Sequence, residues 1–261
     1  NTDYSITSGG TGTTNNTVTL RWLTTGSKTV TVNYNNASGC SAVSATSSTA
    51  TTVNAPTVNA GAALTAICSG ATSAAMGGSF GGSATGGTWS GGIGTWTNAT
   101  NASTATYTAG ASESGTVTLT LTTTGGACGT TTATKNITVN ARPTITFTAQ
   151  AGASVCANTD VTYTTQSGQS NYVWTVPGVL NTDYSITSGG VGTSSNTVTL
   201  KWLTTGSKTV TVNYNNASGC SATSATSSTA TTVNARPTVT FTAQAGASAC
   251  ANTDVTYTTQ S

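Results

Sequence analysis

Two segments of this sequence each occur twice, and these duplications restrict the chain to a fold built from repeated units. Residues 1–40 return at residues 181–220 with four changes. Residues 142–167 return at residues 236–261 with two changes, Ile145 against Val239 and Val155 against Ala249. Near-identical repeats indicate a quasi-linear array in which each unit mainly contacts its neighbours.

The duplications divide the chain into four parts of two types. Residues 141–234 are expected to be a complete type-one β-sandwich repeat, because its two duplicated segments run together without a break. Residues 55–140 are expected to be a complete type-two β-sandwich repeat with a similar plan. Residues 1–54 match the C-terminal part of a type-one repeat, and residues 235–261 match the N-terminal part of a further one. We therefore expect the chain to be a window on a longer array.

Charged residues are rare, which argues against several classes of partner. The chain has seven basic and five acidic residues and no histidine, for a net charge of +2. No basic stripe is present to hold nucleic acid or an anionic membrane, so we expect no nucleic-acid partner and no direct membrane insertion. Leu, Ile, Val and Phe supply only 37 of 261 residues. That low content raises the question of disorder, but disorder usually requires a high net charge as well.

Apolar residues in the type-one unit alternate with threonine, the pattern of half-buried strands. The expected strands are 144–149, 161–165, 172–176, 184–190, 196–203, 207–214 and 221–233. Seven strands at roughly ten-residue spacing, without a helical period, predict an all-β fold. The predicted architecture is a series of tandem immunoglobulin-like β-sandwich domains arranged end to end as a rod.

The junctions between units are short, and each contains a proline. Pro56, Pro143 and Pro237 fix the backbone φ angle where one unit is expected to pass into the next. This predicts a semi-rigid rod rather than a flexible string of domains.

Cysteine spacing predicts one disulfide in each complete unit. Cys68 and Cys128 lie 60 residues apart in the type-two unit, and Cys156 and Cys220 lie 64 apart in the type-one unit. The two remaining cysteines are expected to pair outside this sequence. Each bridge would stabilise its unit by roughly 4 kcal/mol and would imply an oxidising compartment, so we expect export. Metal binding is the alternative, but the sequence has no CxxC motif, no histidine and no carboxylate cluster.

The tryptophans allow two interpretations. Trp174 and Trp202 lie on expected strands and fit a sandwich core. In the alternative interpretation, exposed aromatic rings form a platform on which sugars stack. Trp89, Trp96 and Trp202 are the candidate glycan-contact aromatics, and their solvent exposure decides between the two.

Catalytic chemistry has little support in the sequence. A nucleophile and base pair needs a histidine or a positioned carboxylate, but the acidic residues occur singly. These residues are Asp3, Glu113, Asp160, Asp183 and Asp254. Asp160 and Asp183 each follow Asn-Thr, and Asn-Thr-Asp triplets are typical of turns. We predict no catalytic residue, no metal site and no cofactor, and expect that the chain is not an enzyme.

Two long segments carry a resemblance to a known family. "QSGQSNYVWTVPG…NTVTLKWLTTGSKTVTVNYNNASGCSA" resembles the PKD-like and immunoglobulin-like repeats of giant Bacteroidota cell-surface adhesins, and "GTWSGGIGTWTNATNASTATYTAG…GTVTLTLTTTGGAC" is similar to their companion repeat. The family includes mobile adhesins of gliding motility, exported by type IX secretion and held at the outer membrane. The resemblance implies an extracellular location, with outer-membrane anchoring through a parent protein.

The expected function is that of a structural and adhesive repeat segment of a very long surface filament, which multiplies weak contacts with surfaces or glycans. Its expected partners are neighbouring repeats of the same chain, surface polysaccharide or other cells, and parallel filaments through lateral self-association. An array of carbohydrate-binding modules is the alternative, and an enzyme is the third hypothesis.

Overall fold

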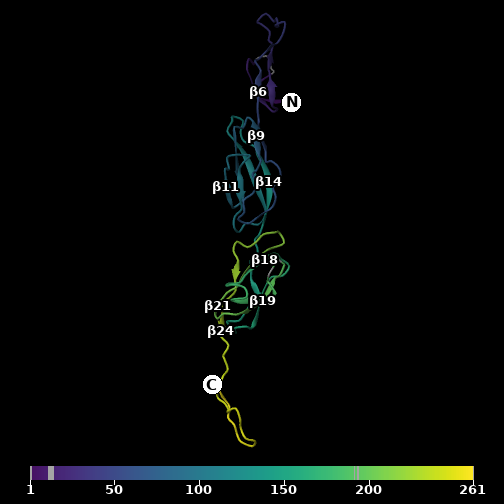
Figure 1. Cartoon of the computed structure of the whole chain (residues 1–261). Coiled ribbons are helices and arrows are strands. Elements are labelled where there is room, and N and C mark those ends of the chain that lie inside the picture. Colours follow the sequence, from purple (N-terminus) through teal and green to yellow (C-terminus); the bar gives the residue numbers. More distant parts are fainter. Residues whose placement is uncertain (1, 11–14, 191, 193, 261) are drawn as a thin grey trace. The chain divides into compact units, whose positions relative to one another are not determined.

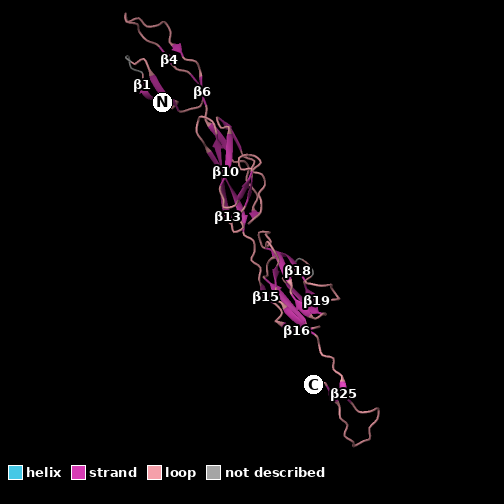
Figure 2. Ribbon diagram, turned by 90° about the vertical axis from the view of Figure 1, so that its left-hand side faces the viewer, coloured by secondary structure: helices cyan, strands magenta, loops and turns pink. Residues whose placement is uncertain are grey.

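The computed structural model of the chain describes residues 2–10, 15–190, 192 and 194–260 (Figures 1 and 2). These residues form strands, turns and loops, with no helix among them. The predicted all-β fold is therefore confirmed. The chain divides into two compact units, Asn1–Ala141 and Arg142–Ser261. The finer division into four parts stays a prediction.

The type-two repeat is built around one four-stranded sheet in the order β10-β13-β14-β8. Its strands are β10 (Gly86–Ser90), β13 (Gly115–Thr124), β14 (Thr132–Asn140) and β8 (Ile67–Cys68). Two smaller pairs complete the repeat: β7 (Pro56–Asn59) with β9 (Ser79–Gly82), and β11 (Thr95–Thr97) with β12 (Thr106–Thr108). β13 and β14 are antiparallel neighbours, whereas β8 runs parallel to β14 at its C-terminal end.

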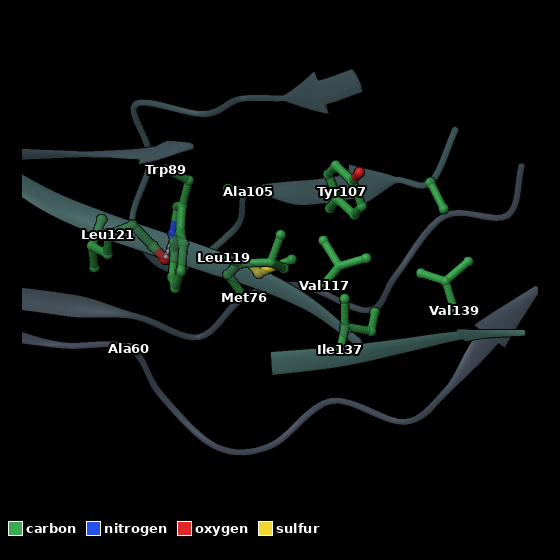
Figure 3. Close-up of a cluster of buried hydrophobic side chains, with 12 residues drawn as sticks. Ala60, Met76, Trp89, Ala105, Tyr107, Val117, Leu119, Leu121, Ile137 and Val139 are labelled. Atoms are coloured by element: carbon green, nitrogen blue, oxygen red, sulfur yellow. Dashed lines mark hydrogen bonds between the residues drawn. The ribbon is translucent and has the colours of Figure 1, made fainter. Parts of the chain in front are cut away.

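The core of this repeat forms on one face of the long strands (Figure 3). β13 alternates strictly, so Val117, Leu119 and Leu121 point inward while the threonines between them point outward. Ile137 and Val139 continue the apolar layer on β14. Further buried side chains from the smaller strands and loops complete the cluster: Met76, Trp89, Ala105 and Tyr107.

Gly78 contributes to the packing of this core, which has few large side chains. A Cβ atom on Gly78 would lie 2.8 Å from the Trp89 ring and 2.9 Å from Leu121. The Gly78 amide also donates to the Ala102 carbonyl at 2.9 Å. The backbone of Gly78 therefore packs directly against the Trp89 ring, at a place where an aliphatic side chain would otherwise lie.

The complete type-one repeat contains three sheets. One sheet has the order β15-β17-β20-β19, with β15 (Phe147–Ala149), β17 (Asp160–Thr165), β20 (Thr197–Trp202) and β19 (Tyr184–Gly189). The second has the order β16-β24-β21, with β16 (Ser154–Cys156), β24 (Thr231–Asn234) and β21 (Gly206–Lys208). The third joins β18 (Ser170–Thr175), β22 (Thr211–Asn215) and β23 (Thr226–Ser227). Buried residues of the first two sheets share one cluster, which makes this repeat a β-sandwich.

Two predicted strands are interrupted because the chain changes sheets. The predicted strand 207–214 is divided into β21 and β22, which pair with different neighbours. The predicted strand 221–233 is likewise divided into β23 and β24. At the crossing, the Val210 amide donates to the Ser228 hydroxyl at 3.0 Å and the Ser228 amide donates to the Val210 carbonyl at 2.8 Å. Val210 is fully buried there.

The duplicated terminal segments form the same short pairings but bury little. Residues 2–53 contain β1 (Tyr4–Gly9), β2 (Val18–Trp22), β3 (Gly26–Lys28), β4 (Thr31–Val32), β5 (Thr46–Ser47) and β6 (Thr51–Val53), and residues 241–259 contain β25 (Phe241–Ala243) and β26 (Thr258–Thr259). Val32 is 58% exposed, whereas its counterpart Val212 is 0% exposed. The duplicated valine is buried only in the copy in which β18 lies beside its strand. Burial of this residue therefore depends on the neighbouring strand.

This contrast predicts different costs for one substitution made in two copies. Val212→Ala should lower the free energy of unfolding of the type-one repeat by about 2 kcal/mol, because it removes fully buried methyl groups. Val32→Ala should change the free energy of unfolding by less than about 0.5 kcal/mol, because substitutions at exposed positions usually have effects of this size. Urea unfolding followed by tryptophan fluorescence measures both. Equal effects of the two substitutions would contradict the assigned burial.

Candidate binding surfaces

The candidate glycan-contact aromatics are mostly internal. Trp89 is 2% exposed and Trp202 is 0% exposed, so neither ring is available to stack on a sugar. The Trp89 indole donates to the Ala102 carbonyl at 2.9 Å, which fixes the ring in the core. The glycan-contact hypothesis is therefore wrong for Trp89 and Trp202. On β20, Val198 and Leu200 alternate with polar residues, and that alternation favoured the core interpretation of Trp202.

Trp96 on β11 is the remaining candidate, and it is half-buried. Its ring stacks on Trp89 with centroids 5.9 Å apart and an angle of 14°, and it contacts Tyr107 at 5.1 Å. Its indole donates to the Gly91 carbonyl at 3.1 Å. The inner side of the ring is thus fully used in packing, and only a part of the ring remains for a ligand.

An aromatic groove of about 430 Å³ lies in the type-one repeat. We call it the β18–β19 groove; the lining residues that matter here are Tyr172, Trp174, Leu180, Tyr184, Ile186 and Val198. Trp174, predicted as core, is half-buried at the groove, and its indole donates to the Ser195 carbonyl at 2.9 Å. Sequence reasoning missed the groove because alternation assigns a residue to a face and does not show whether that face is fully covered.

Threonine hydroxyls form an ordered outer face on the type-two repeat. We define the β13–β14 face by four cross-strand pairs: Thr116 with Thr138, Thr118 with Asn136, Thr120 with Thr134, and Thr122 with Thr132. Thr118 donates to the Asn136 side chain at 2.9 Å. The inward positions between them are apolar apart from Lys135, so the outer face carries hydroxyl, amide and methyl groups without a charge. The two strands lie about 4.8 Å apart, and successive pairs follow one another at about 6.8 Å along the strands.

The type-one repeat has a smaller counterpart of this face. Thr162 and Thr199 are opposite each other on β17 and β20, and their hydroxyl oxygens are 3.0 Å apart. The next row pairs Thr164 with Thr197 at 3.4 Å. Uncharged hydroxyl rows thus occur in both complete repeats.

The predicted disulfide pairing is not formed. Cys128 and Cys156 are exposed free thiols, so neither bonds its predicted partner. Cys68 and Cys220 are disulfide-bonded. The pairs Cys68–Cys128 and Cys156–Cys220 were therefore wrong. The prediction rested on sequence spacing, which does not show at which end of a strand each cysteine lies.

One buried carboxylate holds the glycine-rich turn of the type-two repeat. Glu113 is 7% exposed and accepts hydrogen bonds from the Tyr107 hydroxyl at 2.5 Å, the Ile93 amide at 3.0 Å and the Gly110 amide at 2.9 Å. Burial alone raises the pKa of Glu113, but these three hydrogen bonds outweigh it and place the pKa below the usual 4.5. Every oxygen is occupied by a structural donor, so Glu113 is a clamp and is not positioned as a catalytic acid.

Lys135 is also buried, on the inner side of β14. Its ammonium group donates to the Ala62 carbonyl at 3.0 Å and the Met76 carbonyl at 2.5 Å and lies 5.4 Å from the Trp89 ring centre. Burial lowers the pKa of Lys135. Its contacts hold two loops against the sheet, so this charge also serves the fold.

The other acidic residues occur in turns or at strand ends. Asp183 accepts the Val179 amide at 2.8 Å in the turn that begins at Asn181, where φ is 64°, as expected for an Asn-Thr-Asp turn. Asp160 accepts the Thr187 hydroxyl at 2.9 Å and lies 3.8 Å from the Lys201 ammonium. Among the residues that the structure describes, no three His, Cys, Asp or Glu side chains are grouped so that they could hold a metal ion. The same residues include no helix with the length and hydropathy to cross a membrane.

Comparison with known proteins gives distant structural likenesses only. No protein-family description matches the sequence, and no curated protein matches it. The D00-D0 domain of intimin matches 69% of this chain and 99% of its own, with 13% identity and a TM-score of 0.33. The I67–I69 fragment of titin matches 71% of this chain and 66% of its own, with 13% identity and a TM-score of 0.36. The human desmocollin-1 ectodomain matches 79% of this chain and 47% of its own, with 12% identity and a TM-score of 0.33. At these scores the fold assignment depends on the strand pairing described above.

The Glu113 clamp predicts an acid-labile type-two repeat. Because the folded-state pKa of Glu113 lies below its unfolded value of 4.5, its stabilising effect is present above that pH and is lost as pH falls through the folded pKa. Glu113→Gln should remove this part of the pH dependence and should destabilise the repeat at pH 7 by on the order of 1–3 kcal/mol. Urea unfolding between pH 2 and pH 7 measures both effects.

Asp254→Asn is the control, since it removes an exposed carboxylate from another segment. If Glu113→Gln and Asp254→Asn had the same pH profile, the assignment of the clamp would be wrong.

Proposed function

We propose that this chain is a structural and adhesive repeat segment of a long cell-surface filament, which spaces and multiplies weak contacts with surfaces or glycans. The observation that carries the proposal is that both complete repeats present rows of uncharged hydroxyl groups on regular, antiparallel strands. A single such face offers only weak hydrogen bonds, because water competes for each hydroxyl. Many faces on one chain add to a useful avidity.

The location outside the cell is part of the same proposal. Disulfide-bonded cysteines form and persist mainly in oxidising compartments, and Cys68 and Cys220 are bonded. The resemblance to repeats of Bacteroidota surface adhesins supports type IX export, anchoring at the outer membrane through a parent protein, and a role in gliding motility. Lateral self-association of such filaments would use the same rows of hydroxyl groups.

A binding assay tests the β13–β14 face. The purified chain should bind particles of crystalline cellulose, an uncharged surface, weakly, and binding should rise steeply when several chains are displayed on one bead. Thr118→Lys combined with Thr134→Lys should reduce binding several-fold, because two ammonium groups would have to be desolvated against an uncharged surface. Bead retention under flow measures the effect.

Thr97→Lys is the matched control, since it places the same charge on an exposed threonine of β11, away from that face. Equal losses with the control, or no retention at any bead density, would contradict the adhesive role of the face.

A carbohydrate-binding module is the second candidate, and the β18–β19 groove favours it. Aromatic rings in a groove of this size can stack on the apolar face of a sugar ring. Tyr184→Ala should abolish oligosaccharide-induced chemical-shift changes at the groove in NMR spectra. Tyr4→Ala changes the same residue of the duplicated segment and should leave them unaffected. If no oligosaccharide shifts any groove resonance, this second function fails and the filament proposal stands.

A further inference from the structure

The second strand of each complete repeat pairs in parallel with the last strand. In the type-one repeat these strands are β16 and β24, with Val155 opposite Val233. In the type-two repeat they are β8 and β14, with Ile67 opposite Val139. The two repeats differ in sequence and in sheet order, yet both join the beginning of the repeat to its end in this way. We call each of these strand pairs the parallel pair of its repeat.

Parallel pairing determines how a pull along the chain acts on these strands. Tension on the chain before a repeat draws the second strand toward its own N-terminus, and tension after the repeat draws the last strand toward its own C-terminus. Because the two strands run in the same direction, the two pulls are opposite and lie along the strands, across the hydrogen bonds between them. The bonds therefore share the load, whereas a pair opened from one end loses its bonds one at a time.

The parallel pair also closes each repeat into a loop. Residues 157–230 lie between β16 and β24, and residues 69–131 lie between β8 and β14. Neither segment can lengthen under a pull on the two ends of its repeat until the parallel strands separate. The resistance of each repeat to tension thus depends on its parallel pair.

Side chains extend the parallel pair of the type-one repeat at both ends. The Gln150 side chain, which precedes β16, accepts the Thr229 amide at 3.0 Å. After β24, the Arg236 guanidinium donates to the Ala157 carbonyl at 2.7 Å and to the Thr159 hydroxyl at 3.0 Å. The first and last parts of this repeat are therefore joined over a longer distance than the three paired residues of each strand.

Buried side chains reinforce the parallel pair of the type-two repeat. The Ser69 amide, directly after β8, donates to the Asn140 carbonyl at 2.9 Å, and the Ser69 hydroxyl lies 3.2 Å from the same oxygen. Lys135 on β14 donates to the Ala62 carbonyl, five residues before β8, at 3.0 Å. Ser69 and Lys135 are both buried, so water has little access to compete for these bonds.

We propose that the parallel pair makes each complete repeat a load-bearing unit, which carries tension along the filament without unfolding. A filament that holds a cell to a surface transmits the drag on that cell through all its repeats in series, since the repeats follow one another in a single chain. The inference rests on the proposed filament. It does not depend on the rows of hydroxyl groups, because a filament with other adhesive groups would bear the same load.

Single-molecule force spectroscopy of the full chain tests the proposal. The chain is held by its two ends, with reductant present so that no disulfide carries load. Each complete repeat should unfold in one abrupt step and release up to about 320 Å of chain, the extended length of roughly 90 residues. Residues 141–234 outnumber residues 55–140 by eight, so the type-one step should be about 28 Å longer. Gradual lengthening without these two steps would overturn the proposal.

Arg236→Ala and Lys201→Ala compare a side chain of the parallel pair with one outside it. Both substitutions remove a basic side chain from the type-one repeat, but the Lys201 ammonium lies 3.8 Å from Asp160, across the antiparallel β17–β20 pair. The bonds of Arg236 must break before the repeat lengthens. Arg236→Ala should therefore raise the unfolding rate at constant force several-fold, whereas Lys201→Ala should leave it nearly unchanged.

Ser69→Ala and Ser73→Ala make the same comparison in the type-two repeat. The two serines are 4% and 6% exposed, but the Ser73 hydroxyl accepts the Tyr107 amide at 3.0 Å, outside the parallel pair. Urea unfolding gives the loss of stability caused by each substitution. Ser69→Ala should speed unfolding under force by the whole factor by which it lowers the folding equilibrium constant, and Ser73→Ala by much less.

Equal unfolding rates under force for Arg236→Ala and Lys201→Ala would overturn the proposal. If circular dichroism shows that a serine variant does not fold, this type-one comparison decides alone, because Arg236 is exposed and its loss leaves the core intact. Retention on cellulose is measured with the same proteins. Failure of the unmodified chain to bind cellulose would contradict its adhesive role and leave the load-bearing role standing.

Discussion

Strict alternation of small aliphatic and threonine side chains is the constraint on which the rest of the structure depends. With so few large apolar residues, the core of the type-two repeat depends on those that lie on the inner faces of its strands, and the register of β13 and β14 buries Val117, Leu119 and Leu121 together. The outer face then consists of the residues left over, which are mostly threonine. The core and the hydroxyl face are two results of one pattern.

Much of this could be predicted from the sequence, because alternation encodes the face of each residue directly. The all-β fold, most strand positions and the core location of Trp202 follow from it. The pattern does not encode where a strand leaves one sheet for another, so the crossing at Val210 was not predictable. It also cannot show that Trp174 borders an open groove, since coverage of a face depends on distant loops.

The cysteine pairing failed for a different reason. Spacing along the chain suggested bridges within each repeat. Here a short strand pairs in parallel with the last strand of the repeat, and this places Cys68 and Cys156 beside the final residues of β14 and β24. Parallel pairing between segments so far apart in the chain leaves no local signal in the sequence.

The bare backbone at Gly78 has a consequence for how the type-two repeat can change over time. Any side chain at this position would collide with Trp89 and Leu121, so even alanine forces the indole to move. The outer threonines meet no such restriction, because their side chains point into solvent. A gene that encodes many such repeats is thus free to diversify the exterior of every copy while a few glycines preserve the interior.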